Sequence, residues 1–151
     1  LSSDRINGMA RNNNLVSKPI TEKQLQLSIV RALQLLGYTV FETGKTRTKV
    51  LCPTCKTRHY ATGWQGNTIG VPDIYIHHRL WKIPIGLGVE LKTEKGTVRT
   101  QQQIFADLNV THISRSLDDV LNILHTVELV VGNDTTRKKL EEFINNEYRR
   151  F

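Results

Sequence analysis

Two short polar motifs on neighbouring predicted strands constrain this chain more than any other feature of its sequence. A Gly-Val-Pro-Asp segment ends at Asp73 and opens a strand predicted over 73–77, where a proline costs no ladder hydrogen bond. A Glu-Leu-Lys segment closes a second strand, predicted over 87–92. Side chains alternate along a strand, so Glu90 and Lys92 share one face while Leu91 points into the core. The two strands therefore offer two carboxylates and one ammonium group from adjacent positions in a sheet.

The order of the predicted elements indicates an α/β domain with a mixed sheet. Thr21 is predicted to cap a helix whose apolar residues recur at helical spacing up to Gly37, a typical residue after a helix C-terminus. Thr100 and Ser116 are predicted caps of later helices, and Asp134 begins the last one. Further strands are predicted over 38–41, 48–51, 58–62 and 110–114.

The paired motifs suit metal-assisted cleavage of a phosphodiester bond. Asp73 and Glu90 offer the hard oxygen ligands that Mg²⁺ prefers. The metal would lower the pKa of a bound water, and Lys92 would orient that water and offset charge developing on the phosphate. The competing interpretation is an ordinary exposed strand face, since Glu-x-Lys and Pro-Asp are each common alone. Their combination on consecutive predicted strands is much rarer and favours a site.

Positive charge is concentrated in two parts of the sequence. The chain carries a net charge of +7, and residues 43–60 include several bases and no acid. A second basic cluster lies near the C-terminus, around Arg137, Lys138 and Lys139. Such clusters favour a polyanionic partner, most often nucleic acid. With the loop after Lys92 included, the predicted DNA-binding residues are Lys45, Arg47, Lys49, Lys56, Arg58, Lys95 and Arg99.

Taken together, the motifs resemble the PD-(D/E)XK nuclease superfamily and, within it, the virus-type replication-repair nuclease (VRR-Nuc) family. The resemblance runs from about Thr21 to Leu124. It includes an acid in the first helix (Glu22), the Gly-x-Pro-Asp and Glu-x-Lys motifs, a glycine and a helix glutamine. Counting from Gly96 selects Gln102 from three consecutive glutamines. An Arg-Ser-x-Asp-Asp turn from Arg115 closes the pattern, whereas Arg99 stands where the family usually has serine.

The resemblance implies a restriction-endonuclease-like core and a Mg²⁺- or Mn²⁺-dependent DNA endonuclease. It implies catalytic residues Glu22, Asp73, Glu90, Lys92 and Gln102. The implied metal ligands are Asp73, Glu90, the Leu91 carbonyl and Glu22, the last directly or through a water. It also implies a homodimer acting on double-stranded or branched DNA, such as Holliday junctions. The alternatives are a site-specific endonuclease, restriction-like or from a mobile element, and a non-catalytic nucleic-acid-binding domain. Glu22 also suits the start of a helix without any catalytic role, and Gln102 could simply be a solvated helix residue.

On this interpretation the chain has three parts: a flexible N-terminal arm over 1–19, a nuclease core over 20–126 with an insertion at about 43–69, and a strand and helix extension over 127–151. The insertion holds the only two cysteines, Cys52 and Cys55, which with His59 are candidates for a zinc site or simply form a tight turn. Two cysteines, no secretory pattern and no apolar run long enough to span a membrane indicate an intracellular protein.

Overall fold

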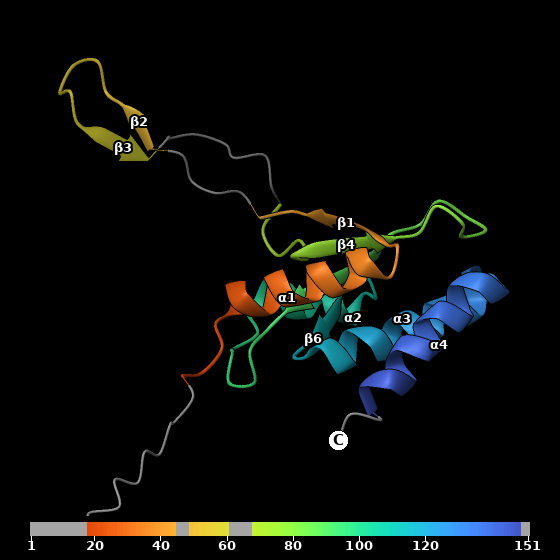
Figure 1. The fold of residues 1–151 in the computed structure, drawn as a ribbon. Coiled ribbons are helices and arrows are strands. Elements are labelled where there is room, and N and C mark those ends of the chain that lie inside the picture. The colour runs from red at the N-terminus through yellow and green to blue at the C-terminus, as the bar shows by residue number, and fades with distance from the viewer. Residues whose placement is uncertain (1–17, 45–48, 61–67, 149–151) are drawn as a thin grey trace, which may run out of the picture.

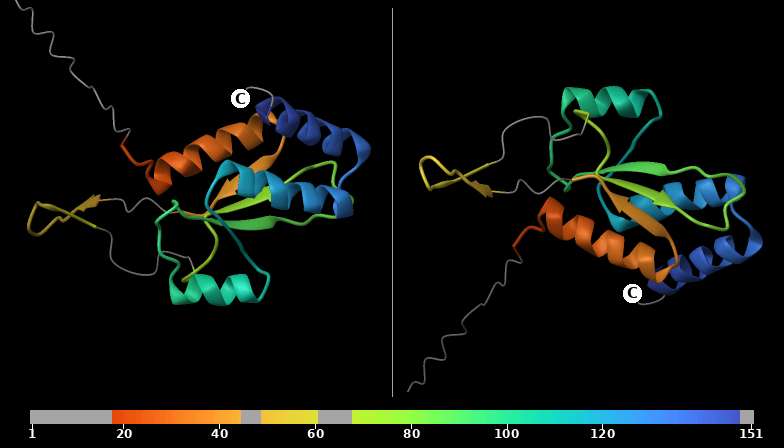
Figure 2. Two further views of the ribbon diagram at one scale, coloured as in Figure 1. Left: turned by 90° about the horizontal axis from the view of Figure 1, so that it is seen from below. Right: turned by 90° about the horizontal axis from the view of Figure 1, so that it is seen from above.

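The computed structural model describes residues 18–44, 49–60 and 68–148, and these form an α/β fold. A four-stranded mixed sheet has helices α1 (Glu22–Leu35), α3 (Leu117–Val131) and α4 (Asp134–Tyr148) on one face and α2 (Thr100–Asp107) on the other (Figures 1 and 2). The α/β class and the helix-flanked mixed sheet confirm the coarse prediction from the sequence.

The sheet has the order β1-β4-β5-β6, with β1 (Thr39–Glu42) at one edge and β6 (His112–Ser114) at the other. β1 and β4 (Ile74–His77) pair antiparallel, as do β4 and β5 (Leu87–Leu91). β5 and β6 pair parallel, and the crossover between them contains α2. The two central strands are therefore the ones that carry the Pro-Asp and Glu-x-Lys motifs.

Helix α1 begins and ends where local signals place it. The Thr21 hydroxyl accepts from the backbone N–H of Gln24 at 3.2 Å, and the Gln24 side chain accepts from the Thr21 N–H at 2.9 Å. Gly37 follows the helix with φ of +92°, a conformation that glycine adopts without strain. This capping fixes Glu22 as the first helical residue and directs its side chain toward the strand motifs.

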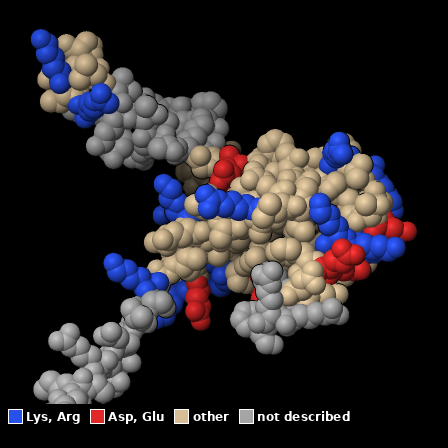
Figure 3. Space-filling view, viewed as in Figure 1, with Lys and Arg blue, Asp and Glu red and all other residues tan. Residues whose placement is uncertain are grey.

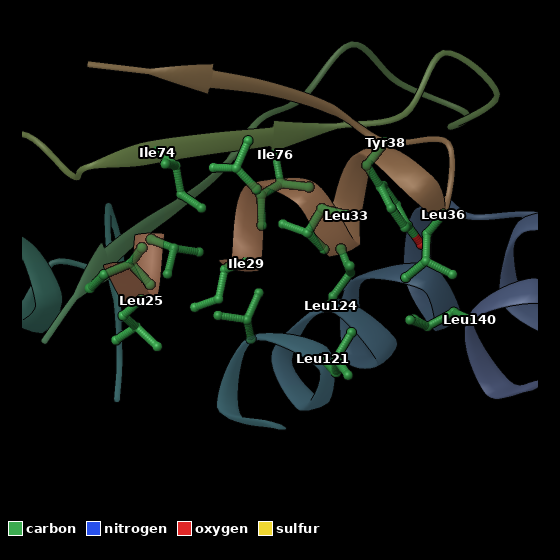
Figure 4. Packing of buried hydrophobic residues seen from close by; sticks show 14 of the residues in the cluster. Leu25, Ile29, Leu33, Leu36, Tyr38, Ile74, Ile76, Leu121, Leu124 and Leu140 are labelled. Carbon is green, nitrogen blue, oxygen red and sulfur yellow. The ribbon is translucent and has the colours of Figure 1, made fainter. Parts of the chain in front are cut away.

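The hydrophobic core lies between the sheet and the helices α1, α3 and α4 (Figure 4). Ile29 and Leu33 of α1, Ile74 and Ile76 of β4 and Leu124 of α3 are fully buried there. Such burial contributes roughly 1.5–3 kcal/mol per large aliphatic side chain. This face of the sheet therefore supplies most of the packing that holds the central strands in place.

The strand predicted in the C-terminal extension is wrong for the described residues. Helix α3 instead continues through Val131, and α4 follows after a short break. The apolar, β-branched run around Val127 resembles a strand locally, but Val127 and Val131 fall on the same helical face as Leu124 and join the core. Thr100 is likewise the first residue of α2 rather than its cap, which is Arg99.

Strands β2 (Lys49–Leu51) and β3 (Arg58–Tyr60) form a separate antiparallel hairpin within the predicted insertion (Figure 1). Its turn is closed by two backbone hydrogen bonds, from Cys52 N to Thr57 O and from Lys56 N to Cys52 O, each 2.9 Å long. Among the described residues, no helix is both long and apolar enough to cross a membrane.

Candidate active site

Asp73 lies immediately before β4 and is held there by hydrogen bonds. Its Oδ2 accepts the backbone N–H of Leu91 in the neighbouring strand at 2.8 Å. Its backbone carbonyl accepts the N–H of Thr43 at 2.9 Å, and the Thr43 hydroxyl donates to the carbonyl of Pro72. These bonds leave Asp73 Oδ1 with no bond to another described residue, so one carboxylate oxygen is available for a ligand.

Glu90 and Lys92 lie beside Asp73 as the strand alternation predicts. Glu90 is 2 % exposed and Lys92 is 6 % exposed, and Leu91 is buried on the other face. The ammonium of Lys92 lies 3.3 Å from Glu22 Oε1 and 3.5 Å from Glu90 Oε1. The pair with Glu22 therefore joins the first helix to the central sheet, and the pair with Glu90 holds the ammonium over the end of β5.

Gln102 contacts Glu90 directly. Its side-chain Nε2 donates to Glu90 Oε1, and its Oε1 accepts the backbone N–H of Arg99 at 2.9 Å. Gln102 is thus bound into the cluster at the start of α2 and is not a solvated helix residue. Its amide holds one carboxylate oxygen of Glu90 in a fixed direction.

The clustered acids have perturbed ionisation. Burial, together with the negative charge of Asp73, raises the pKa of Glu90 to about 7 although Lys92 partly offsets both effects. Burial also raises the pKa of Asp73, against the opposing effects of the Leu91 N–H and of Lys92. Neighbouring carboxyl groups with raised pKa values are typical of catalytic and metal-binding sites.

A pocket of about 460 Å³ opens beside this cluster and includes a residue that the sequence analysis missed. Glu42, at the end of β1, lines it together with Glu22 and Asp73. Glu42 pairs in register with Ile74, the residue after Asp73, and its Oε1 accepts from Gln26 Nε2 at 2.9 Å. The pairing of β1 with β4, rather than any motif, places this fourth acid at the site.

The carboxylates suit a divalent cation, although their present arrangement is not a coordination shell. Among the described residues, no three His, Cys, Asp or Glu side chains are close enough to hold one metal ion. The donor set is nevertheless all hard oxygen, and the mutual repulsion of Asp73 and Glu90 is what Mg²⁺ or Mn²⁺ would relieve. Asp73, Glu90 and the Leu91 carbonyl would hold the ion, with Glu22 able to turn toward it.

The loop after Lys92 is fixed by Arg115, the first residue of the Arg-Ser-x-Asp-Asp turn, whose side chain had no predicted role. Nη1 of Arg115 donates to three backbone carbonyls, those of Thr93 at 2.7 Å, Gly96 at 2.9 Å and Glu94 at 3.2 Å. The same loop carries Lys95 and Arg99, two of the predicted DNA-binding residues, and both are exposed. Arg115 therefore holds a basic loop next to the acidic pocket.

The remaining predicted DNA-binding residues belong to the insertion. Lys56 and Arg58 are exposed on the β2–β3 hairpin, and on the face shown in Figure 3 its charged side chains are all basic. The backbone of Lys49 is in β2, but its side chain lies outside the described part, as do Lys45 and Arg47. The structure thus presents positive charge on two separate elements, the hairpin and the 93–99 loop.

The predicted zinc residues lie in the same hairpin. Cys52 and Cys55 flank its turn, Cys55 Sγ lies 2.9 Å from Thr57 Oγ1, and Lys56 has φ of +55°. The side chain of His59 lies outside the described part of the chain. Zinc binding by these three residues stays a prediction.

Comparison of this chain with protein-family models, curated proteins and solved structures finds no significant match.

Proposed function

We propose that this chain is a Mg²⁺- or Mn²⁺-dependent DNA endonuclease of the PD-(D/E)XK superfamily, with a VRR-Nuc-like, restriction-endonuclease-like core. One observation carries the proposal: Glu22, Asp73, Glu90, Lys92 and Gln102 come from four different elements and meet beside one pocket. A fold gains no stability from collecting three acids around a buried lysine, since desolvation of the charges offsets their attraction. Chemistry on a charged substrate accounts for the arrangement better than structure does.

In the proposed mechanism each residue has a distinct task. A bound cation would supply an activated water and stabilise charge on the phosphate. Asp73 and Glu90 would hold the cation, and the Leu91 N–H and the Gln102 amide hold those carboxylates in position. Lys92 would leave its ion pairs with Glu22 and Glu90 to face the attacking water and the scissile phosphate.

The proposed substrate is DNA, because the described chain exposes basic side chains on two elements, the 93–99 loop and the β2–β3 hairpin. Lys95 and Arg99 on the loop, and Lys56 and Arg58 on the hairpin, are exposed and would contact phosphates of the DNA backbone. A non-catalytic binding domain would have no use for carboxylates at such a surface, since they repel phosphate. Homodimer formation and a preference for branched DNA belong to this proposal as its expected family traits.

Asp73→Ala and Glu90→Ala should each abolish metal-dependent cleavage, because each removes a ligand that no neighbour replaces. The test incubates each variant with a four-way junction, a flap and a linear duplex in Mg²⁺, with EDTA as the metal-free arm. Glu94→Ala is the matched control, an exposed acid of the adjacent loop that does not line the pocket. DNA binding in Ca²⁺ and thermal unfolding would show that the variants are folded. Near-wild-type turnover in either variant would refute the site.

Metal affinity should rise steeply between pH 6 and pH 8. With the pKa of Glu90 at about 7, a proton competes with the metal at pH 6, where only about one carboxyl in ten is ionised. Titration of Mn²⁺ without DNA should therefore show about tenfold weaker binding at pH 6 than at pH 8. Because folding raises this pKa above its ordinary value of 4.5, Glu90 costs stability as the pH rises from about 4.5 to 7.

The same experiment on Glu90→Gln provides the control for this pH dependence. The variant should bind Mn²⁺ weakly at both pH values, with most of the pH dependence removed. Added Mn²⁺ should also raise the melting temperature of the unaltered protein more at pH 8 than at pH 6. A pH-independent affinity in the unaltered protein would show that Glu90 is not a metal ligand.

A further inference from the structure

Another pocket, of about 210 Å³, lies at the end of α1 remote from Glu22. Its lining includes Gly37 after α1, His78 and Arg79 after β4, and Thr135 and Lys139 of α4. The length of α1, about 1.5 Å per residue, separates this pocket from the proposed metal site by roughly 20 Å. The two pockets share no lining residue.

His78 presents an unused hydrogen-bond donor to this pocket. The ring is 8 % exposed, and its Nδ1 accepts the backbone N–H of Leu80 at 3.1 Å. An accepting Nδ1 leaves the proton of the neutral ring on Nε2. Burial, together with the nearby charges of Arg79, His77 and Lys139, lowers the pKa of His78 against the opposing effect of Glu128, which favours this neutral form. Nε2 has no hydrogen-bond partner among the described residues.

The ammonium of Lys139 lies beside the same space as the His78 ring. A Cβ placed on Gly37 would lie 3.6 Å from His78 Nε2 and 3.7 Å from Lys139 Nζ, so both nitrogens border the space above this glycine. Within the described chain Lys139 forms no salt bridge, whereas Arg137 on the same helix pairs with Asp134 at 2.5 Å and with Glu141 at 3.8 Å. Two nitrogen donors therefore face a space that no described acceptor fills.

The start of α4 adds positive potential to this space. Asn133 caps the helix by accepting the N–H of Thr136 at 2.9 Å, and Thr135 lies in the first turn beside the pocket. Backbone N–H groups of a first turn point toward the helix start and attract anions. The buried carboxylate of Glu128 accepts its three hydrogen bonds from Tyr38, Trp81 and Thr136 and none from His78 or Lys139.

We propose that this pocket, beside the start of α4, binds a phosphate group. The donors are His78 Nε2–H, the Lys139 ammonium and the Arg79 guanidinium. The inference is independent of the proposed nuclease activity, since it uses none of the same residues. The phosphate could be inorganic phosphate or the terminal phosphate of a nucleic acid strand. Both offer the same tetrahedral oxyanion to the same donors, and the experiment separates them.

The test follows the imidazole nitrogens of ¹⁵N-histidine-labelled protein during titration with inorganic phosphate in EDTA, at constant ionic strength. The Nε2 resonance of His78 should shift on binding, and Lys139→Ala should weaken phosphate affinity at least tenfold. Lys138→Ala is the matched control, an exposed neighbour that does not line the pocket, and should bind like the unaltered protein. His78→Gln should lose affinity as well, with circular dichroism as the check on folding.

A second titration uses a dinucleotide with a 5′-phosphate and the same dinucleotide with a 5′-hydroxyl. Tighter binding of the phosphorylated dinucleotide than of inorganic phosphate would identify a strand end as the ligand. Tighter binding of inorganic phosphate would identify the free ion. Equal phosphate affinity in Lys139→Ala and Lys138→Ala, or an unmoved His78 resonance, would overturn the proposal. Neither result would bear on the nuclease, whose residues remain intact in all these variants.

Discussion

Lys92→Ala is expected to lower the single-turnover rate of DNA cleavage by about 10²–10³-fold, the typical cost of losing one preorganised electrostatic group. Divalent metal binding should survive the change. An ammonium group donates hydrogen bonds and cannot ligate a cation, so Asp73 and Glu90 remain available. Removing its positive charge from beside Glu22 and Glu90 also removes a repulsive neighbour of the metal. Metal affinity is therefore expected to hold or increase while the chemical step fails.

Two further variants give this prediction its controls. Lys92→Arg keeps the charge but spreads it over a planar fork that cannot occupy the same point, so it should restore only part of the rate. Lys95→Ala removes an exposed base from the adjacent loop and should weaken DNA binding without slowing cleavage at saturating enzyme. The measurements are single-turnover rates in Mg²⁺ and DNA affinities in Ca²⁺.

The competing view treats Lys92 as one more phosphate anchor. On that view Lys92→Ala would behave like Lys95→Ala, with lower affinity and an unchanged rate at saturation. The burial of Lys92, which is 6 % exposed and in contact with two carboxylates, argues against a simple surface anchor. An unchanged single-turnover rate in Lys92→Ala would nevertheless show that Lys92 has no catalytic role.

The part of the site that could be predicted from sequence depends on strand periodicity. Side chains alternate along a strand, so Glu90 and Lys92 share one face whatever the rest of the fold is. In the structure the two side chains do lie side by side and form an ion pair. The capping of α1 likewise depends on local residues, and it fixes the position of Glu22. These features need only interactions between residues near one another in the chain.

The missed features all depend on tertiary contacts. Glu42 reaches the pocket only because β1 pairs with β4, and no motif marks it. Arg115 holds the 93–99 loop by donating to backbone carbonyls. Every residue has such a carbonyl, so no sequence pattern marks the partners. The helical state of 127–131 follows from packing against the core, which overrides the strand preference of a local β-branched run. Sequence patterns cannot specify which distant segment an element meets.

The buried carboxylate of Glu128 is the clearest of these tertiary features. It is fully buried in α3 and accepts from Tyr38 Oη at 2.5 Å, Trp81 Nε1 at 2.9 Å and Thr136 Oγ1 at 2.5 Å. Its three partners come from the segment after α1, the β4–β5 connection and α4. Burial and the bond to Glu128 raise the pKa of Tyr38, which keeps its hydroxyl protonated as a donor. One side chain therefore ties together four parts of the fold.

Gly132 shows how closely the chain approaches this carboxylate. A Cβ on Gly132 would lie 1.8 Å from Glu128 Oε2, well inside contact distance, although its φ of −77° suits any residue. Glycine is thus required there for space and not for backbone conformation. The residue at the end of α3 is constrained by the buried acid one turn earlier.

Glu128→Ala is accordingly expected to lower the free energy of unfolding by about 3–5 kcal/mol, because it leaves three buried donors unsatisfied and opens a cavity. Marginal domains have only ~5–15 kcal/mol in total, so the variant would be partly unfolded near physiological temperature. Urea denaturation followed by circular dichroism measures the loss.

Tyr38→Phe removes a single donor and should cost only about 1 kcal/mol, which keeps the network testable if Glu128→Ala does not fold. Glu141→Ala breaks surface pairs with His125 and Arg137 and should change stability by under ~1 kcal/mol. A Glu128→Ala protein as stable as Glu141→Ala would mean that the donors find other partners, and that the four elements are held together by apolar packing alone.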